Sequence, residues 1–243
     1  MHLLLGRPRV VRLPPGWFEW RIHRGLQRVA RLLPGLQRAT CLPPGRSRTA
    51  LLPLELARAG LESKGYSPLR AFVALELPEP FAGEVSALAR QLRPAVAGRF
   101  MKPETYHLTL AFLGEIGEPE AARAISALDE VCERCGAVRL SADGLGTFGR
   151  PHDATLWLGI ALTEELRALA EAVRSGLEER GIAYDRKAFR PHITLARRAR
   201  LPQGDLPELV FPDPERAYRV ALFKSELSQE GASYKELYHI DLG

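Results

Sequence analysis

One four-residue pattern constrains the fold of this chain more than any other feature, because it occurs twice. His107-Leu108-Thr109-Leu110 recurs as His192-Ile193-Thr194-Leu195, 85 residues further along the chain. Each copy lies in a run of β-prone residues that predicts a strand. Side chains alternate across a strand, so the histidine and threonine of each copy leave on one face while the aliphatic residues turn to the core. Two such strands in a pseudo-twofold arrangement would direct two imidazoles and two hydroxyls into one cleft.

The chain from residue 69 onward mixes short strand-like runs with amphipathic helical patterns. Strands are predicted at 70–77, 106–113, 138–140, 155–161, 189–196, 217–227 and 234–242. Helical spacing is present at 79–93, 118–134 and 163–180. Strands and helices do not follow a strict βαβ alternation, and several strands are joined by short turns or follow the last helix. We therefore predict an α+β fold with largely antiparallel sheets.

The first quarter of the chain differs in composition from the rest. Residues 1–66 hold 12 Lys and Arg against 3 Asp and Glu, whereas residues 67–243 hold 22 against 26. Pro-Gly breaks interrupt the early segment, and it buries too little apolar surface to offset its ordering entropy. We interpret residues 1–68 as a basic extension that is disordered or precedes the true start; a basic arm for RNA or an anionic membrane, or a transit peptide, is the alternative. The folded domain is predicted to span residues 69–243.

Two imidazoles and two hydroxyls in one cleft suit the cleavage of a phosphodiester. That reaction needs a base to activate the incoming oxygen and an acid to protonate the leaving one, and two histidines with pKa values of about 6.5 can hold opposite protonation states at neutral pH. The hydroxyls of Thr109 and Thr194 can donate to the non-bridging phosphate oxygens. No metal or cofactor is required. The alternative for each histidine is a structural role, and the repetition in matched strands favours function.

No metal site is predicted, and two further patterns are interpreted as structural. Neither His-x-Thr copy has a second ligand at metal spacing, so we predict no metal site. The run Gly144–Gly149 matches G-x-G-x-x-G, but a predicted strand follows it where a dinucleotide site needs a helix, so we interpret these residues as turn glycines. Cys132 and Cys135 end a predicted helix and are interpreted as reduced thiols.

The sequences around both copies carry a resemblance to a known family. The runs Arg70–Pro78, Phe100–Glu115 and Phe189–Arg197 occur in the expected order, together with Phe148–Pro151 and Ser233–Tyr234. They resemble the RNA 2′,3′-cyclic phosphodiesterases, also called 2′–5′ RNA ligase-like proteins, of the two-histidine phosphoesterase superfamily. The resemblance extends from about residue 69 to the C-terminus, and nothing before residue 69 takes part. It implies a bilobal fold in which the sheets line a V-shaped central cleft and the helices lie outside.

The resemblance also implies roles for individual residues. His107 would be the general acid that protonates the departing 3′ oxygen, and His192 the base that activates water. Thr109, Thr194 and Arg197 would hold the phosphate. Regular alternation, however, puts Arg197 on the opposite face from the histidine and threonine of its strand, so a bulge or the strand's end is needed to bring it to the cleft. A solvated surface arginine is the alternative.

Four more residues are candidates for contacts with the terminal nucleotide. Phe148 and Arg150 are expected to stack on it and pair with it, and Tyr106 and Tyr234 to line the cleft. For these four, packing or surface roles are equally consistent with the sequence.

We therefore predict a metal-independent enzyme that hydrolyses RNA 2′,3′-cyclic phosphodiester ends to 2′-phosphomonoesters. A reversible 2′–5′ RNA ligase, a small cyclic-nucleotide phosphodiesterase and a non-catalytic nucleotide- or RNA-binding module remain alternatives. The expected partners are RNA ends or nucleotides, without a membrane, and the protein is expected to be a monomer in the cytoplasm.

Overall fold

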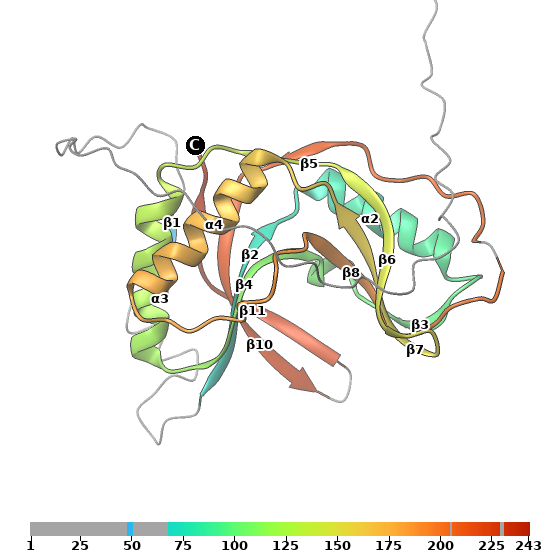
Figure 1. The fold of residues 1–243 in the computed structure, drawn as a ribbon, viewed down its shortest axis with the longest axis horizontal. Coiled ribbons are helices and arrows are strands. Elements are labelled where there is room, and N and C mark those ends of the chain that lie inside the picture. The colour runs from blue at the N-terminus through green and yellow to red at the C-terminus, as the bar shows by residue number, and fades with distance from the viewer. Residues whose placement is uncertain (1–47, 51–67, 205, 229–230) are drawn as a thin grey trace, which may run out of the picture.

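The computed structural model describes residues 48–50, 68–204, 206–228 and 231–243 (Figure 1). In these residues the elements are β1 (Arg48–Ala50), β2 (Leu69–Glu76), α2 (Glu79–Leu92), β3 (Ala97–Phe100), the 3-10 turn η2 (Pro103–Thr105), β4 (His107–Ile116), α3 (Glu118–Cys132), β5 (Val138–Leu140), β6 (Ala142–Arg150), β7 (Asp153–Ile160), α4 (Glu164–Glu179), β8 (His192–Arg200), β9 (Glu215–Ala217), β10 (Arg219–Ser228) and β11 (Gly231–Asp241).

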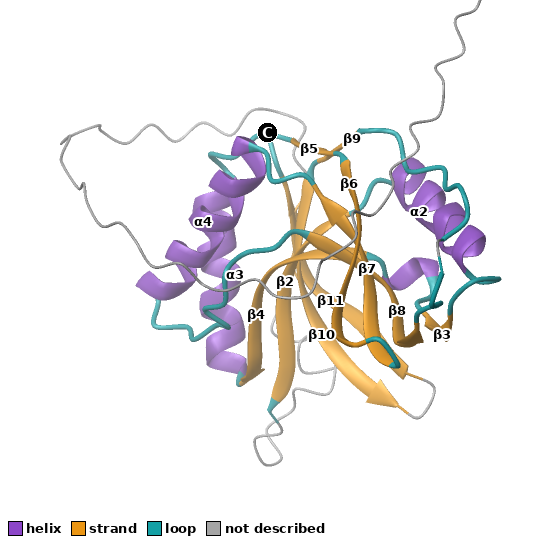
Figure 2. Ribbon diagram, turned by 45° about the vertical axis from the view of Figure 1, so that its right-hand side comes forward, coloured by secondary structure: helices purple, strands orange, loops and turns teal. Residues whose placement is uncertain are grey.

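The strands form two main sheets, and all their pairs are antiparallel. The first sheet has the order β1-β11-β10-β2-β4 and the second the order β3-β8-β7-β6, while β5 and β9 form a separate pair. Figure 2 shows α3 and α4 on one side of the strands and α2 on the other. The predicted α+β fold with antiparallel sheets and outer helices is confirmed.

The three helices form where their apolar spacing predicts them. The expected apolar face of α2, made by Phe81, Val85, Leu88 and Leu92, is at most 1% exposed. At the start of α4 the Thr163 hydroxyl accepts a hydrogen bond from the backbone N–H of Leu166, which satisfies one of the free donors of the first turn.

Helices α3 and α4 pack against each other on the outer face of the first sheet. Their contact is close because Gly176 of α4 has no side chain: a Cβ there would lie 2.8 Å from Cγ1 of Val131. Tyr238 of β11 reaches this layer and donates its hydroxyl to Asp129 of α3. The helical layer therefore leaves the opposite face of the first sheet for the cleft.

The outcome for the predicted N-terminal extension and for the glycine run Gly144–Gly149 differs from the expectations drawn from the sequence. Of the predicted extension, residues 1–47 and 51–67 lie outside the described residues, and Arg48–Ala50 forms a strand paired with β11. The glycines interpreted as turn residues are instead part of β6, so that interpretation was wrong. A Cβ on Gly146 would lie 2.1 Å from the ring of its cross-strand partner Trp157, so a residue without a side chain is needed there.

Candidate active site

Both predicted histidines begin a strand, and the two strands meet. His107 is the first residue of β4 and His192 the first of β8, and β4 lies against β8 where the two sheets come together. Thr109 and His192 line the same cavity of about 630 Å³, with Phe112, Phe148 and other residues. His192 and Arg197 are also close enough to His107 to lower its pKa. The structure thus brings the two motifs into one cleft.

The two imidazoles are held in the same way. Nδ1 of His107 lies 2.8 Å from the carbonyl oxygen of Thr105, and Nδ1 of His192 lies 2.7 Å from the carbonyl oxygen of Arg190. A carbonyl oxygen can only accept, so each Nδ1 carries the proton and donates it. Each Nε2 is therefore left to accept or deliver a proton, which is the arrangement that acid–base catalysis requires.

A β-bulge in each motif strand changes which side chains face the cleft. Thr194 pairs with Trp157 and Ala196 pairs with Leu156, so β8 has one extra residue, Leu195, between them. Leu195 and Ala196 are both buried, and the alternation resumes one residue later. Arg197 therefore returns to the face of Thr194.

The first motif has the same irregularity at the equivalent position. Thr109 pairs with Ala74 and Ala111 with Val73, so Leu110 is the extra residue of β4. The residue equivalent to Arg197 is then Phe112, which lines the cavity with Thr109. The two motif strands therefore share a bulge at the same position. At the residue after the bulge that faces the cleft, β8 has an arginine, whereas β4 has a phenylalanine.

Aromatic rings surround both histidines. The ring centre of His107 lies 4.7 Å from that of Phe72 and 5.0 Å from that of Tyr234. The ring of His192 lies 5.1 Å from Phe148 and 5.8 Å from Trp157. These contacts fix the orientation of the imidazoles and supply flat surfaces on which a base can stack.

The surroundings of His107 lower its pKa to about 4. Burial, which disfavours the charged imidazolium, is the largest cause, and nearby His192 and the positive charge of Arg197 act in the same direction. The hydrogen bond to Thr105 opposes them. His107 is therefore neutral at pH 7 in these surroundings, and a bound phosphate anion would raise its pKa by charge attraction.

The four residues predicted to contact the terminal nucleotide differ in whether the structure places them near the histidines. Tyr234 lies beside His107, and Phe148 lies beside His192 and lines the cavity. Arg150 is exposed at the end of β6, two residues from Phe148 and on the same face. Tyr106 is 8% exposed and packs in the hydrophobic core, so the structure does not bring it to the cleft. Tyr106 directly precedes His107, the first residue of β4, and its backbone is extended. Successive side chains of extended backbone point to opposite faces, so the side chain of Tyr106 points away from the face of His107.

Arg174 of α4 lines the cavity but was not among the site residues predicted from the sequence. Its Nε donates to the carbonyl oxygen of Leu110, the bulge residue of β4, at 3.0 Å, and its Nη1 donates to that of Lys187 at 3.3 Å. The guanidinium also lies over the ring of Phe189 at 5.1 Å. Arg174 thus ties the strand of the first motif to the loop that leads into the second. Its signal in the sequence, one arginine on an amphipathic helix, is shared by many surface residues.

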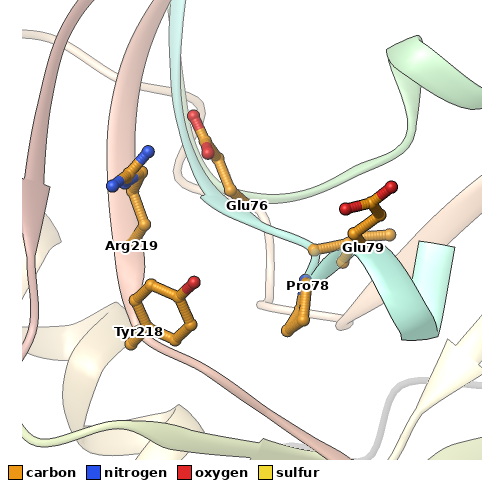
Figure 3. A pocket seen from close by; sticks show the side chains of 6 residues that line it. Glu76, Pro78, Glu79, Tyr218 and Arg219 are labelled. Atoms are coloured by element: carbon orange, nitrogen blue, oxygen red, sulfur yellow. The ribbon is translucent and has the colours of Figure 1, made fainter.

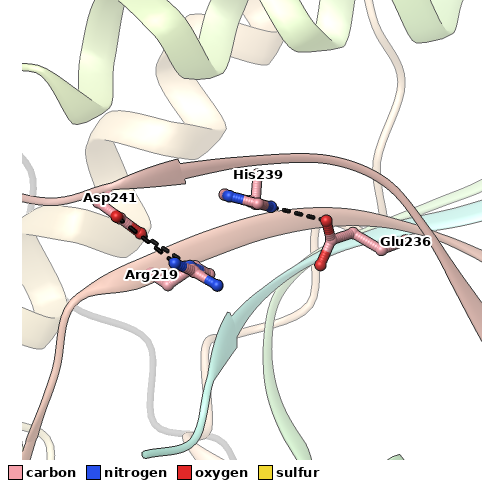
Figure 4. Close-up of polar contacts among 4 residues, drawn as sticks. All are labelled: Arg219, Glu236, His239 and Asp241. Atoms are coloured by element: carbon pink, nitrogen blue, oxygen red, sulfur yellow. Dashed lines mark hydrogen bonds and ion pairs between the residues drawn. The ribbon is translucent and has the colours of Figure 1, made fainter. Parts of the chain in front are cut away.

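A second polar cluster lies at the end of the first sheet that also holds His107. Glu76 and Arg219 line a small cavity of about 80 Å³ (Figure 3). Arg219 pairs with Asp241 at 2.7 Å, and His239 donates from Nδ1 to Glu236 at 2.6 Å (Figure 4). Burial, followed by a hydrogen bond and charge repulsion from Glu236, raises the pKa of Glu76 to about 7. None of these side chains lines the larger cavity, but the cluster adjoins the site, because Glu76 of β2 lies directly opposite His107 of β4.

Neither a metal centre nor a membrane-spanning helix is found in the described part of the chain. Within residues 48–50, 68–204, 206–228 and 231–243, no group of three or more His, Cys, Asp or Glu side chains is arranged to hold a metal ion. Over the same ranges, no helix has the length and apolar character needed to span a membrane.

A bilobal α+β fold with paired His-x-Thr strands at the junction of its sheets defines a phosphoesterase of the two-histidine class. Comparisons with known proteins agree. The family model described as LigT like Phosphoesterase matches residues 75–157 and 160–234. This chain belongs to the LigT-like phosphoesterase family.

Individual relatives and solved structures lead to the same family. The RNA 2′,3′-cyclic phosphodiesterase of Thermus thermophilus is 32% identical over 181 residues, which cover 72% of this chain and 90% of the relative. A crystal structure of a Thermus thermophilus protein superposes with a TM-score of 0.62 at 30% identity, covering 72% of this chain and 98% of that one. E. coli LigT in complex with 3′-AMP superposes with a TM-score of 0.57 at 27% identity over the same shares.

Proposed function

We propose that this chain hydrolyses the 2′,3′-cyclic phosphodiester at the end of an RNA chain to a 2′-phosphomonoester, with His107 and His192 as the proton-transfer groups. The observation that carries this proposal is the matched geometry of the two imidazoles, each with its Nδ1–H donated to a carbonyl and its Nε2 left free. A module that only binds phosphate needs hydroxyls and an arginine, and has no use for two such groups. The names of the relatives support the same substrate.

The proposed reaction proceeds by a single displacement at phosphorus. Nε2 of His192 accepts a proton from water while the water oxygen bonds to phosphorus. The bond between phosphorus and the 3′ oxygen breaks, and the leaving oxygen takes the proton of His107 Nε2. The products are a 2′-phosphate and a 3′-hydroxyl, with the proton now on His192.

The protonation state of His107 is set by the substrate in this scheme. The imidazole is neutral at pH 7 in the surroundings that the structure shows, because burial and nearby positive charge lower its pKa to about 4. The cyclic phosphate carries a negative charge, which favours the imidazolium that an acid requires. Substrate binding thus favours the protonated form of His107, which is the form that acts as the general acid.

The remaining predicted residues are assigned to binding. Thr109, Thr194 and Arg197 donate to the non-bridging oxygens as negative charge grows on them. Phe148, Tyr234 and Arg150 are assigned to the terminal nucleotide, since Phe148 and Tyr234 flank the two histidines. Tyr106 has no part in this assignment.

The proposal is tested with an RNA oligonucleotide ending in a 2′,3′-cyclic phosphate, in the presence of EDTA. The wild-type chain should produce the 2′-phosphate, identified by mass and by ³¹P NMR, whereas His107→Ala and His192→Ala should each lower kcat by at least about 10²-fold. His152→Ala, in the exposed turn between β6 and β7, is the matched control and should act like wild type. Binding that survives both substitutions without turnover would instead identify a binding module.

The proposed activity also carries expectations about the catalytic unit, the cellular location and the oligomeric state. Residues 69–243 form the catalytic unit, and we place the protein in the cytoplasm, where the free thiols of Cys132 and Cys135 stay reduced. We also expect the protein to be a monomer. Size-exclusion chromatography with light scattering tests the oligomeric state.

A further inference from the structure

Two arginines lie side by side at the edge of the cleft. Arg99 of β3 is the direct cross-strand partner of Arg197 of β8. Residues directly opposite in an antiparallel pair point to the same face, with Cα atoms roughly 4.5–5.5 Å apart. The bulge of β8 turns Arg197 to the cleft face, so Arg99 lies on that face as well. Both side chains are exposed.

A second bulge follows directly after Arg197. Relative to β3, strand β8 has one extra residue between Arg197 and Arg200, and relative to β7 it has one between Ala196 and Ala199. The extra residue, Arg198, has φ of 51° and is the one non-glycine residue with positive φ within the described part of the chain. Such backbone is costly and is concentrated at functional sites. The bulge restores the alternation, so Arg200, opposite Ala97, joins Arg99 and Arg197 on the cleft face.

These three guanidiniums have no acidic partner among the described residues, and like charges directly opposite on neighbouring strands are destabilising. Several other arginines of the domain pair with a carboxylate, for example Arg123 with Glu120 and Arg180 with Glu130. Within the part of the chain that the structure describes, the cluster is therefore unneutralised, even though residues 67–243 hold more acidic than basic side chains. Concentrated, unpaired positive charge beside a phosphate site is what an additional anion requires.

We propose that Arg99 and Arg200 form a second anion subsite, which binds the phosphate on the 5′ side of the terminal nucleotide of an RNA chain. This inference rests on the proposed function, because Arg197 is taken to hold the reacting phosphate. That phosphate joins the 2′ and 3′ oxygens of the terminal nucleoside, so the next phosphate along the chain is the one on its 5′ oxygen. The subsite makes the enzyme prefer an RNA end over a cyclic mononucleotide.

The test compares three substrates: adenosine 2′,3′-cyclic phosphate, its 5′-phosphorylated form, and the dinucleotide ApA with a 2′,3′-cyclic phosphate end. The measured quantity is the ratio of kcat/KM for the dinucleotide to kcat/KM for the cyclic mononucleoside. Arg99→Gln should lower this ratio about tenfold, and Arg99→Lys, which keeps the charge, should retain most of it. For the dinucleotide, log kcat/KM falls linearly with the logarithm of the salt concentration, and Arg99→Gln should make the slope of this line less steep by about 0.7.

The matched control is Arg123→Gln on the outer helix α3, which makes the same change of charge and should leave the ratio at its wild-type value. An unchanged ratio in Arg99→Gln, with or without a uniform loss on all three substrates, overturns the subsite. A loss confined to the 5′-phosphorylated mononucleotide assigns Arg99 to a terminal phosphate and overturns the assignment to an RNA chain. Failure of the wild-type chain on every cyclic phosphate overturns the proposed function itself, so the two failures are distinguishable.

Discussion

Substitution of Arg174 tests whether a residue can affect both the stability and the rate of this protein without touching the substrate, because Arg174 joins the two halves of the cleft but does not contact the reacting atoms. Replacement by methionine removes its hydrogen bonds to the carbonyl oxygens of Leu110 and Lys187 and its contact with Phe189. A hydrogen bond from a charged donor contributes about 1.5–3 kcal/mol when buried and less when exposed, as the bond to Lys187 is, and a cation–π contact about 0.5–1 kcal/mol. We expect Arg174→Met to lower the free energy of unfolding by about 2–3 kcal/mol and Tm by about 5–10 °C.

The catalytic consequence follows from the two segments that Arg174 connects. Without it, the bulge of β4 and the loop leading into His192 are no longer tied, and a displacement of about 1 Å between catalytic groups can cost about 10²-fold in rate. We expect Arg174→Met to lower kcat by about 10–100-fold with little change in KM, and Arg174→Lys to recover part of the loss. Urea denaturation and steady-state kinetics on a cyclic-phosphate substrate measure the two effects separately.

Arg180 provides the matched control on the same helix. It also makes two side-chain hydrogen bonds, to the Gly176 carbonyl and to Glu130, but these lie at the contact with α3. Arg180→Met should therefore cost stability and leave kcat close to wild type. If Arg174→Met loses stability while kcat stays at the wild-type value, the positioning role of Arg174 is refuted. Equal losses of kcat in both variants would refute it as well.

Three further substitutions test other parts of the structure. Gly146→Ala places a Cβ 2.1 Å from the ring of Trp157, so we expect a loss of about 1–3 kcal/mol in urea denaturation, and an unchanged midpoint would contradict this packing. Arg198→Gly relieves a left-handed backbone and should raise stability by about 1 kcal/mol; a decrease would show that the φ of 51° carries no strain. The pKa of Glu76 is raised to about 7, so its proton stabilises the folded state at low pH, and this contribution is lost as pH rises from the unfolded-state pKa, near 4.5, through about 7. Glu76→Gln keeps a donor for Glu236 without the charge, so it should raise Tm at pH 8 more than at pH 5, and equal changes at both pH values would contradict the shifted pKa.

Much of the architecture follows from local pattern. The apolar spacing of α2 predicted a helix at 79–93, and the observed helix is Glu79–Leu92 with those apolar residues buried. The two His-x-Thr copies predicted two strands, and both begin at the histidine. These elements are predictable because the period of a helix or a strand is a property of neighbouring residues.

Other features depend on partners that are distant in the sequence. Gly146 of β6 looks like a turn residue until the large ring of Trp157 on the next strand is known to occupy the space that a side chain there would need. Tyr106 and Tyr234 are equal candidates in the sequence, yet one is in the core and the other beside His107. Arg174 acquires its partners from β4 and from the loop before β8, 64 and 13 residues away.

The sequence by itself determined the chemistry: two imidazoles and two hydroxyls, each pair on one face of its own strand, in a chain with two similar halves. Only the tertiary structure decided which other side chains join them. Strict alternation turns Arg197 away from the cleft, and the extra residue Leu195 in β8 turns it back. A bulge is defined by the register between neighbouring strands, and register depends on hydrogen bonds and burial across the sheet rather than on the local pattern of one strand.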